Sequence, residues 1–226
     1  MDIQLDQLTL QLLSEKAIYL PESRALLVAD LHAGKSETFQ QFGIPVSTQV
    51  NQATIERLSQ LCDRLRPERL FILGDWFHSS HSLVDAVLEP WARFLVQRSL
   101  ATTLVVGNHD RQLLADVAAL SVSITIVPEM EFAGLWLTHA PEPPTTGGLT
   151  LCGHVHPCVT LRSALDSLRL PCFYWDRQSR VMILPSFGDF TGGYTLPLTA
   201  GVTAFAIAET ELVALGEVPD SALTQS

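Results

Sequence analysis

The sequence predicts an α/β fold in which mixed β-sheets are covered by helices. Strand and helix patterns alternate through the first half of the chain, whereas the second half is mostly strand-like. The chain has 226 residues, of which 47% are hydrophobic and only 17% are charged. This composition supports a large buried core and excludes a disordered chain. We therefore expect one domain over residues 1–215 and a flexible C-terminal tail at residues 216–226.

The first half of the chain begins with strands and continues with amphipathic helices. Apolar runs predict strands at residues 8–13, 17–20, 24–32, 69–73 and 103–106. Residues 46–65 place apolar side chains on one face at helical spacing, and residues 111–120 form a shorter helical pattern. Another helical pattern covers residues 83–100, where Pro90 either kinks the helix or begins a second one.

The second half of the chain consists mainly of predicted strands and loops. Strands are expected at residues 123–127, 135–139, 149–156, 180–187 and 201–209. Proline and glycine predict loops at residues 140–148 and 188–197. This half therefore adds further sheet to the strand and helix alternation of the first.

Several features of the sequence bear on the location of the protein. No apolar run approaches the ~20 residues that cross a bilayer. The first residues lack a basic stretch followed by an apolar one, which is the pattern of a secretory signal. The cysteines contain no C-x-x-C pair, which fits buried thiols in a reducing compartment. We therefore expect a cytoplasmic protein with no membrane partner.

The charge of the chain bears on its partners. A formal net charge of −10 counts against nucleic acid, because phosphate contacts dominate that affinity, although metals or a local arginine patch can outweigh it. Twelve of the cationic residues are Arg and two are Lys. The best candidates for local positive charge are Arg162, Arg169, Arg177 and Arg180. Aspartates lie among these arginines, so the alternative is that the arginines belong to a solvated surface and bind no substrate.

The histidines are concentrated at the ends of predicted strands. All seven lie between positions 32 and 156, and most follow an apolar run that predicts a buried strand. Ligands collect beyond the carboxyl ends of strands in open α/β sheets. One histidine at a strand end is usually a satisfied polar residue. Five such clusters, each with Asp, Asn or a second His, favour a functional site instead.

These clusters supply metal donors: Asp30, His32, Asp75, Asn108, His139, His154 and His156. In an extended chain, the two members of D-x-H point to the same side, as do those of H-x-H. Seven donors are too many for one tetrahedral zinc and suit two adjacent ions. Two ions about 3.5 to 4 Å apart clamp an oxyanion and lower the pKa of a shared water, which predicts phosphoester hydrolysis. The mixed donors fit Mn, Fe, Zn or Ni.

Five motifs now stand in order along the chain. D-x-H, G-D, G-N-H-D, H and G-H-x-H occupy residues 30–32, 74–75, 107–110, 139 and 153–156. They resemble the motifs of the calcineurin-like metallophosphoesterase superfamily, and the resemblance covers residues 25–160 with no ligand missing. It implies a four-layer αββα sandwich, with two mixed β-sheets flanked by helices and the site at the strand ends.

The resemblance also implies a role for each donor. One metal would be bound by Asp30, His32, Asp75 and His156. The other would be bound by Asp75, Asn108, His139 and His154, so that Asp75 bridges the two. A metal-bridged hydroxide would attack phosphorus. His109 would contact the phosphate and protonate the leaving oxygen, a task that suits imidazole near neutral pH, and Asp110 would orient the His109 ring.

A finer resemblance comes from four segments, at residues 28–35, 74–79, 153–157 and 184–193. Together they are similar to the DNA-ligase-associated metallophosphoesterases, which are relatives of double-strand-break repair nucleases. The resemblance implies DNA as the substrate and a functional association with a DNA ligase, a helicase and an exonuclease. We expect two divalent ions, with Mn²⁺ as the metal that supports cleavage.

Residues near the motifs have competing interpretations. His78 occupies a place where the related repair nucleases have a histidine that helps to position the phosphodiester, and the alternative is a hydrogen bond to a metal ligand. Trp76 and Phe77 are expected to pack, with base stacking as the alternative. Lys35 either complements a substrate phosphate or caps a helix.

Three functions compete at this point. The first is a dinuclear-metal phosphodiesterase that cleaves nucleic acid, as a DNA-repair nuclease. The second is hydrolysis of a small nucleotide diester or pyrophosphate, which the net charge of −10 favours because a small substrate needs no basic track. The third is a scaffold without catalysis, which the complete set of ligands and His109 argues against.

Overall fold

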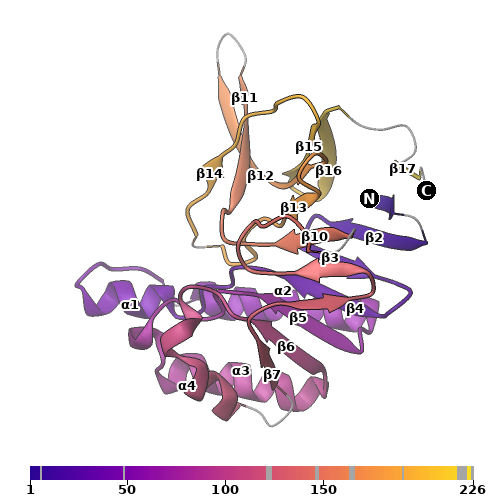
Figure 1. Cartoon of the computed structure of the whole chain (residues 1–226). Helices are drawn as coiled ribbons and strands as arrows, with labels where there is room; N and C mark the ends of the chain where they lie inside the picture. The colour runs from indigo at the N-terminus through magenta and orange to yellow at the C-terminus, as the bar shows by residue number, and fades with distance from the viewer. Residues whose placement is uncertain are drawn as a thin grey trace.

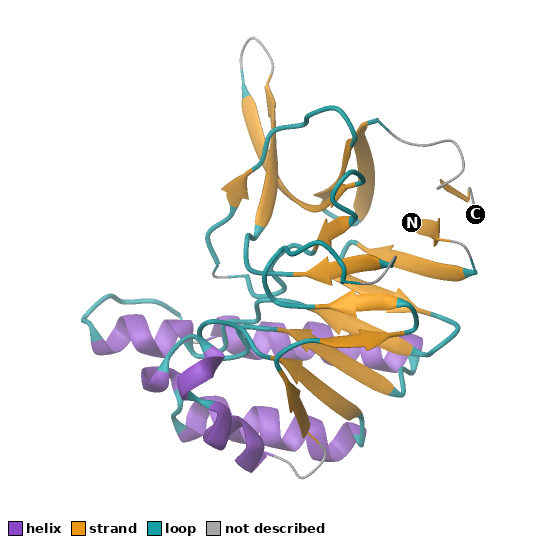
Figure 2. Ribbon diagram, viewed as in Figure 1, coloured by secondary structure: helices purple, strands orange, loops and turns teal. Residues whose placement is uncertain are grey.

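The computed structural model describes residues 1–5, 7–47, 49–120, 124–145, 148–162, 166–189, 191–217 and 223–224. Two β-sheets pack face to face, and the described helices lie together beside the first sheet (Figure 1). Figure 2 shows the same segregation, with helix on one side of the molecule and strand on the other.

The first sheet is mixed and has the order β17-β1-β2-β3-β4-β5-β6-β7. Its strands are β1 (Asp2–Leu5), β2 (Leu8–Leu13), β3 (Ala17–Leu20), β4 (Ala25–Val28), β5 (Arg69–Leu73), β6 (Ala101–Val105), β7 (Ile124–Val127) and β17 (Leu223–Thr224). The pairs from β1 to β4 are antiparallel, and those from β4 to β7 are parallel. Strands β4 and β5 are almost entirely apolar because both of their faces are buried.

Helices cover the outer face of this sheet. They are α1 (Lys35–Gln41), α2 (Gln49–Leu65), α3 (Asp85–Arg98) and α4 (Leu114–Leu120), with short 3₁₀ turns η1 (Ser80–Ser82) and η2 (Asp110–Gln112). The apolar faces of α2, α3 and α4 share one core cluster with the sheet. Pro90 lies inside a single continuous α3 and does not begin a second helix. Burial of Trp91 and Phe94 on that helix offsets the backbone hydrogen bond that proline lacks.

The second sheet is also mixed and has the order β14-β11-β12-β13-β10-β9-β8, with β15 beside β12 and β16 beside β15. Its strands are β8 (Met130–Phe132), β9 (Leu135–Leu137), β10 (Leu149–Cys152), β11 (Pro157–Arg162), β12 (Ser167–Asp176), β13 (Val181–Ile183), β14 (Tyr194–Thr195), β15 (Val202–Ala208) and β16 (Glu211–Gly216). Strand β10 pairs in parallel with β9 and with β13. The pairs β11–β12, β12–β13 and β8–β9 are antiparallel. The predicted fold of two mixed sheets flanked by helices is confirmed.

The helical cover is one-sided in the part of the chain that the structure describes. No described helix follows Leu120, so the outer face of the second sheet lacks the helical layer that a four-layer sandwich implies. Leu196 packs on that face instead, and the Tyr174 hydroxyl donates to the Pro197 carbonyl at 2.8 Å. The glycines and prolines of residues 188–201 explain why this cover is a loop.

The two sheets meet in one apolar core. Leu27 and Phe71 of the first sheet belong to the same buried cluster as Leu151, Phe173 and Met182 of the second. This packing fixes the carboxyl ends of β4, β5 and β6 next to those of β9, β10 and β13, because hydrogen bonds join the loops that follow them. The shared edge is where the polar motifs lie.

Other predictions concern the tail, the thiols and membranes. The last residues of the predicted tail, 218–222 and 225–226, lie outside the described residues. The four cysteines are buried and unpaired, as predicted. Among the described helices, none combines the length and the apolar character that a membrane span requires.

Candidate metal centre

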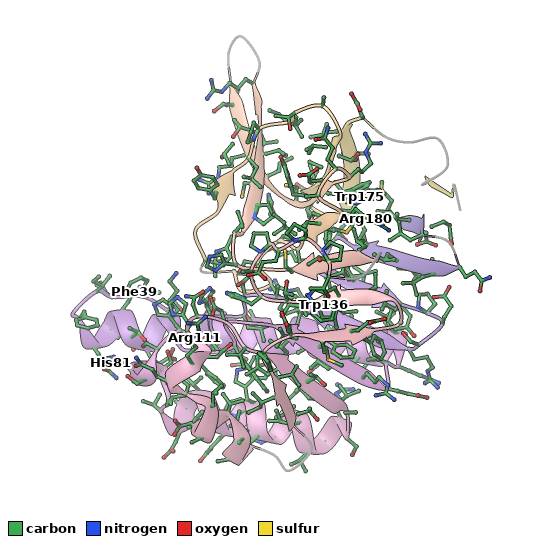
Figure 3. The ribbon with its side chains drawn as sticks, viewed as in Figure 1. Phe39, His81, Arg111, Trp136, Trp175 and Arg180 are labelled. Atoms are coloured by element: carbon green, nitrogen blue, oxygen red, sulfur yellow. The ribbon has the colours of Figure 1, made fainter. Side chains whose placement is uncertain are left out.

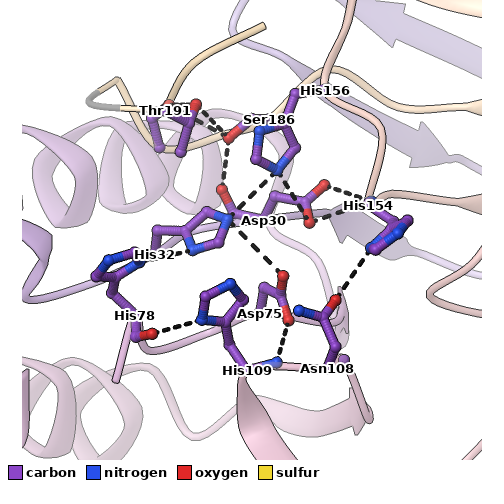
Figure 4. A network of polar contacts seen from close by, with 12 residues as sticks. Asp30, His32, Asp75, His78, Asn108, His109, His154, His156, Ser186 and Thr191 are labelled. Carbon is purple, nitrogen blue, oxygen red and sulfur yellow. Dashed lines mark hydrogen bonds and ion pairs between the residues drawn. The ribbon is translucent and has the colours of Figure 1, made fainter. Parts of the chain in front are cut away.

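The candidate centre is built from loops that follow five strands. Asp30 and His32 follow β4, Asp75 follows β5, and Asn108 follows β6. From the second sheet, His139 follows β9, and His154 and His156 follow β10. Figure 4 shows six of these side chains converging from both sheets on one small region: Asp30, His32, Asp75, Asn108, His154 and His156. The convergence that the strand-end pattern predicts is therefore present for all seven donors.

One group of donors has Asp30 as its carboxylate. Asp30, His32 and His156 offer ligand atoms that all lie within 4.8 Å of one another. Nε2 of His156 lies 3.4 Å from Oδ1 of Asp30 and 3.3 Å from Nε2 of His32. A carboxylate with two imidazoles is a donor set that suits a divalent transition metal.

A second group has Asp75 as its carboxylate. Asp75, His139 and His154 also offer ligand atoms within 4.8 Å of one another. Oδ1 of Asn108 joins them, at 2.9 Å from Nε2 of His139 and 3.0 Å from Nδ1 of His154. Asp30 and Asp75 thus each lie with a separate group of donors in the structure.

Asp75 lies between the two groups. Its Oδ2 is 3.5 Å from Nε2 of His139 and 3.8 Å from Nε2 of His32, so it faces a ligand of each group. Its Oδ1 accepts the backbone N–H of His109 at 2.9 Å, which fixes the carboxylate plane. Asp75 is therefore a carboxylate that lies close to ligands of both groups.

The two carboxylates are buried without a permanent cation. Asp30 is 0% and Asp75 is 3% exposed. In the part of the chain that the structure describes, only imidazole nitrogens form ion-pair contacts with them, and neither Lys nor Arg does. A buried carboxylate is costly unless it is paired or coordinates a metal. The donor chemistry therefore fits two divalent cations held by these residues.

Hydrogen bonds to backbone carbonyls orient two of the imidazoles. Nδ1 of His139 lies 3.0 Å from the Leu73 oxygen, and Nδ1 of His156 lies 2.9 Å from the Gly192 oxygen. A carbonyl can only accept, so each Nδ1 carries a proton, and in the neutral ring Nε2 keeps the lone pair. Such bonds fix the tautomer that a metal needs.

The environment keeps two further imidazoles neutral. Burial, followed by the charges of His156 and His109, lowers the pKa of His32 from 6.5 to about 2. Burial and then the charge of Lys35 lower the pKa of His78 to about 4. Both rings are uncharged at neutral pH, so His32 is ready to bind a cation without losing a proton.

Left-handed backbone conformations aim several donors at the centre. They occur at Asp30 (φ 53°), His32 (φ 45°), Asp75 (φ 51°), His154 (φ 70°) and His156 (φ 51°). Such conformations are uncommon outside glycine and cluster at functional sites. The expectation that D-x-H and H-x-H are extended is wrong, because β4 ends at Val28 and β10 ends at Cys152. Turns past the strand ends bring these side chains together.

Two motif glycines leave space for donors from other loops. A Cβ on Gly74, which has φ 82°, would lie 2.0 Å from Nδ1 of His139. A Cβ on Gly107 would lie 2.2 Å from Oδ1 of Asp75. The G-D and G-N motifs therefore require glycine because a ligand side chain occupies the space that a Cβ would take.

His78 and His109 lie side by side at the edge of the centre. Their rings are stacked, with centroids 5.2 Å apart and an interplanar angle of 24°. Nδ1 of His109 lies 2.6 Å from the backbone oxygen of His78 and therefore donates its proton there. Nε2 of His109 is left as the atom that can take up and release a proton.

His32 connects these rings to the first donor group. His32, His78 and His109 form a third group whose ligand atoms lie within 4.8 Å of one another. Nδ1 of His32 lies 3.5 Å from Nδ1 of His78, whereas its Nε2 faces His156. When Nε2 binds a cation, Nδ1 carries a proton that His78 can accept.

Asp110 does not orient the His109 ring, contrary to what the resemblance implies. Its carboxylate accepts three backbone N–H groups, those of Asp75 (2.8 Å), Trp76 (2.9 Å) and Gly107 (2.9 Å). The His109 ring is held by the His78 carbonyl instead. Burial raises the pKa of Asp110, and the backbone donors oppose this. Asp110 braces the loops after β5 and β6 against each other.

The loop after β13 completes the centre, and the sequence-based predictions missed its residues. Oγ of Ser186 donates to the Asp30 carbonyl at 2.7 Å, and Oγ1 of Thr191 donates to Ser186 at 2.7 Å. The Gly192 carbonyl accepts from His156. One feature of the sequence could have indicated these residues. A loop with glycine and serine follows another buried strand there, within residues 184–193, which carry the finer resemblance.

Residues with competing interpretations can now be placed. Trp76 and Phe77 are 0% exposed and stacked on each other, so the packing role is confirmed. Lys35 is the first residue of α1, where the helix dipole disfavours a cation, so it is no helix cap. Its Nζ lies 5.8 Å from the centroid of the Phe39 ring, and burial lowers its pKa.

Two mixed sheets whose strand ends hold paired groups of carboxylate, amide and imidazole donors define a metal-dependent phosphoric ester hydrolase. The family model for the calcineurin-like phosphoesterases matches residues 23–154, which is more than half of the sequence. The chain belongs to this family, which uses dinuclear metal centres.

Solved structures include a close counterpart. The crystal structure of the Pseudomonas putida nuclease MPE matches with 34% sequence identity and a TM-score of 0.81, and the match covers 94% of this chain and 99% of that chain. The phosphoesterase Yfce from E. coli matches with 16% identity and a TM-score of 0.46, over 85% of this chain and 98% of that chain. Comparison with curated proteins gives no match.

Proposed function

We propose that this chain is a phosphodiesterase that hydrolyses nucleic-acid phosphodiester bonds and acts as a nuclease in DNA repair. The observation that carries the proposal is the placement of His78 and His109 beside two donor groups that share Asp75. The 34% identity to a nuclease, over 94% of this chain, supports a nucleic-acid substrate.

The residues of the chain divide the work of hydrolysis. Asp30, His32 and His156 hold one cation, and Asn108, His139 and His154 hold the other, with Asp75 shared. When bound, the two ions neutralise phosphate oxygens and lower the pKa of a water. His109 faces the leaving oxygen with Nε2 and protonates it, because its Nδ1 is held by the His78 carbonyl.

We also propose the context in which this activity operates. Mn²⁺ is the proposed native metal, and Fe, Zn or Ni fit the same mixed donors. The resemblance to the DNA-ligase-associated metallophosphoesterases supports DNA as substrate and a functional association with a DNA ligase, a helicase and an exonuclease. Residues 1–215 are proposed as a single domain that carries the whole site.

Metal removal tests the activity directly. The protein loaded with Mn²⁺ is expected to cleave single-stranded DNA and bis-p-nitrophenyl phosphate, because the buried donors hold the ions that activate water. Excess chelator should reduce both rates to background, and added Mn²⁺ should restore them. Rates of product formation before and after chelation measure this. Full activity in excess chelator contradicts the proposed chemistry.

Replacement of His78 tests whether the centre is adapted to nucleic acid. We expect His78→Ala to lower DNA cleavage by at least about tenfold, the loss of one charged hydrogen bond to the phosphodiester. Hydrolysis of bis-p-nitrophenyl phosphate should change much less. The rates of both substrates, measured with the Mn²⁺ content, check this.

The alternative role of His78 predicts a different result. If His78 only holds the His32 tautomer, both substrates should lose activity together and the Mn²⁺ content should fall. His81→Ala is the matched control, because His81 is an exposed neighbouring histidine that contacts the Phe42 ring. It should behave like the wild type with both substrates.

A further inference from the structure

A cavity lies next to the candidate metal centre, on the side of His156. Its volume is about 360 Å³, and it lies between the start of β11, the middle of β12 and the loop after β13. The lining includes His156, three glycines of residues 188–193, and the side chains of Lys16, Arg169 and Thr191. It therefore joins a metal donor to two cationic side chains.

The charged side chains of the lining are Lys16, Arg169 and Asp189, so cations outnumber carboxylates there on a protein that is acidic overall. Asp189 accepts from Lys16 at 2.9 Å and from Arg57 at 2.7 Å, so this one carboxylate is already shared by two cations. Arg169 uses one Nη2–H for the Gly193 carbonyl. Among the described residues, no ion pair links Arg169 to a carboxylate, so its guanidinium is available to an anion. The protein as a whole has a net charge of −10.

The other arginines of the same region lie away from this cavity. Arg162 is exposed at the end of β11 that is remote from His156. Arg177 is paired with Glu217 at 3.0 Å. Arg180, labelled in Figure 3, precedes β13, whose opposite end leads to the metal centre. Of the four arginines, only Arg169 lines the cavity.

We propose that this cavity binds a non-scissile phosphate of the polynucleotide, through Arg169 and Lys16, and thereby positions the neighbouring nucleotide beside the metal centre. The inference rests on the proposed nucleic-acid substrate and names how the polymer is held. A guanidinium and an ammonium beside glycine backbone provide donors and room for a tetrahedral, monoanionic phosphodiester group. A small diester has no second phosphate to place there.

The test compares a polymer with a small diester. Arg169→Ala is expected to raise KM for single-stranded DNA by about tenfold, the effect of one charged hydrogen bond, with little change in kcat. Hydrolysis of bis-p-nitrophenyl phosphate should stay within about twofold, since a small diester has no second phosphate for Arg169 to bind. Arg169→Lys should have a KM between those of Arg169→Ala and the wild type. Arg162→Ala is the matched control and should behave like the wild type.

A binding measurement separates this inference from the proposed function. Fluorescence anisotropy with labelled single-stranded DNA, in chelator, should show about tenfold weaker binding for Arg169→Ala than for the wild type. The slope of log K against log salt should become shallower by about 0.7, as expected for one lost phosphate contact.

Each outcome has a defined meaning. Wild-type protein that binds DNA through Arg169 but does not cleave it retains the phosphate site and refutes the nuclease. Cleavage with equal KM and affinity for wild type and Arg169→Ala refutes the phosphate site alone. Equal loss of small-diester hydrolysis in Arg169→Ala also refutes it, because Arg169 then acts only by holding Gly193 near the loop that orients His156. Absence of DNA binding in the wild type refutes both.

Discussion

Asp75→Asn is expected to abolish hydrolysis of every phosphodiester, whether DNA or bis-p-nitrophenyl phosphate. Asp75 is 3% exposed and faces His139 of one donor group and His32 of the other with the same oxygen. Asparagine keeps the shape but presents a neutral oxygen, which cannot bridge two cations. Loss of a residue that hydrogen-bonds to a metal ligand typically costs about 10- to 100-fold in metal affinity or activity. Loss of a ligand that both metals share should therefore cost at least about 100-fold.

Two measurements check this expectation. The Mn²⁺ content per chain should fall below that of the wild type, and the rates with both substrates should fall together. Asp116→Asn is the matched control, because Asp116 is an exposed carboxylate on α4. A variant that keeps both its metal content and its hydrolysis rates would exclude a bridging role for Asp75.

The elements with strong periodicity could be predicted from the sequence. The strands at residues 8–13 and 17–20 have the predicted bounds, because each is a short apolar run between turns. The helix α1 was missed, since its buried residues are Ser36 and Thr38 and give no apolar pattern. The hairpin of β11 and β12 was missed as well, because its outer half is exposed and Pro171 interrupts it.

The convergence of these side chains could also be predicted, but not the way in which they are held. A histidine or carboxylate after a buried strand is a local signal, and strand ends share one edge of a sheet. The contacts of Asp110 with the loops after β5 and β6 depend on packing between segments that are far apart in the chain. The left-handed turn at His32 lies beyond Val28, where β4 ends, and periodicity does not locate that end.

His109→Ala should separate protonation of the leaving group from binding of the metals. We expect DNA cleavage to fall by about 10²- to 10⁴-fold, the range for loss of a general acid. The sugar oxygen that leaves from DNA needs a proton, whereas p-nitrophenolate departs as an anion. Hydrolysis of bis-p-nitrophenyl phosphate should therefore keep most of its rate, and the Mn²⁺ content should not change.

The structure explains why this substitution leaves the donors in place. Asp75 is fixed by the backbone N–H of His109, which alanine retains. The His109 ring belongs neither to the donor group of Asp30 nor to that of Asp75. Equal losses with both substrates would show that the ring supports the centre instead of protonating the leaving oxygen. An unchanged rate of DNA cleavage would mean that another group supplies the proton.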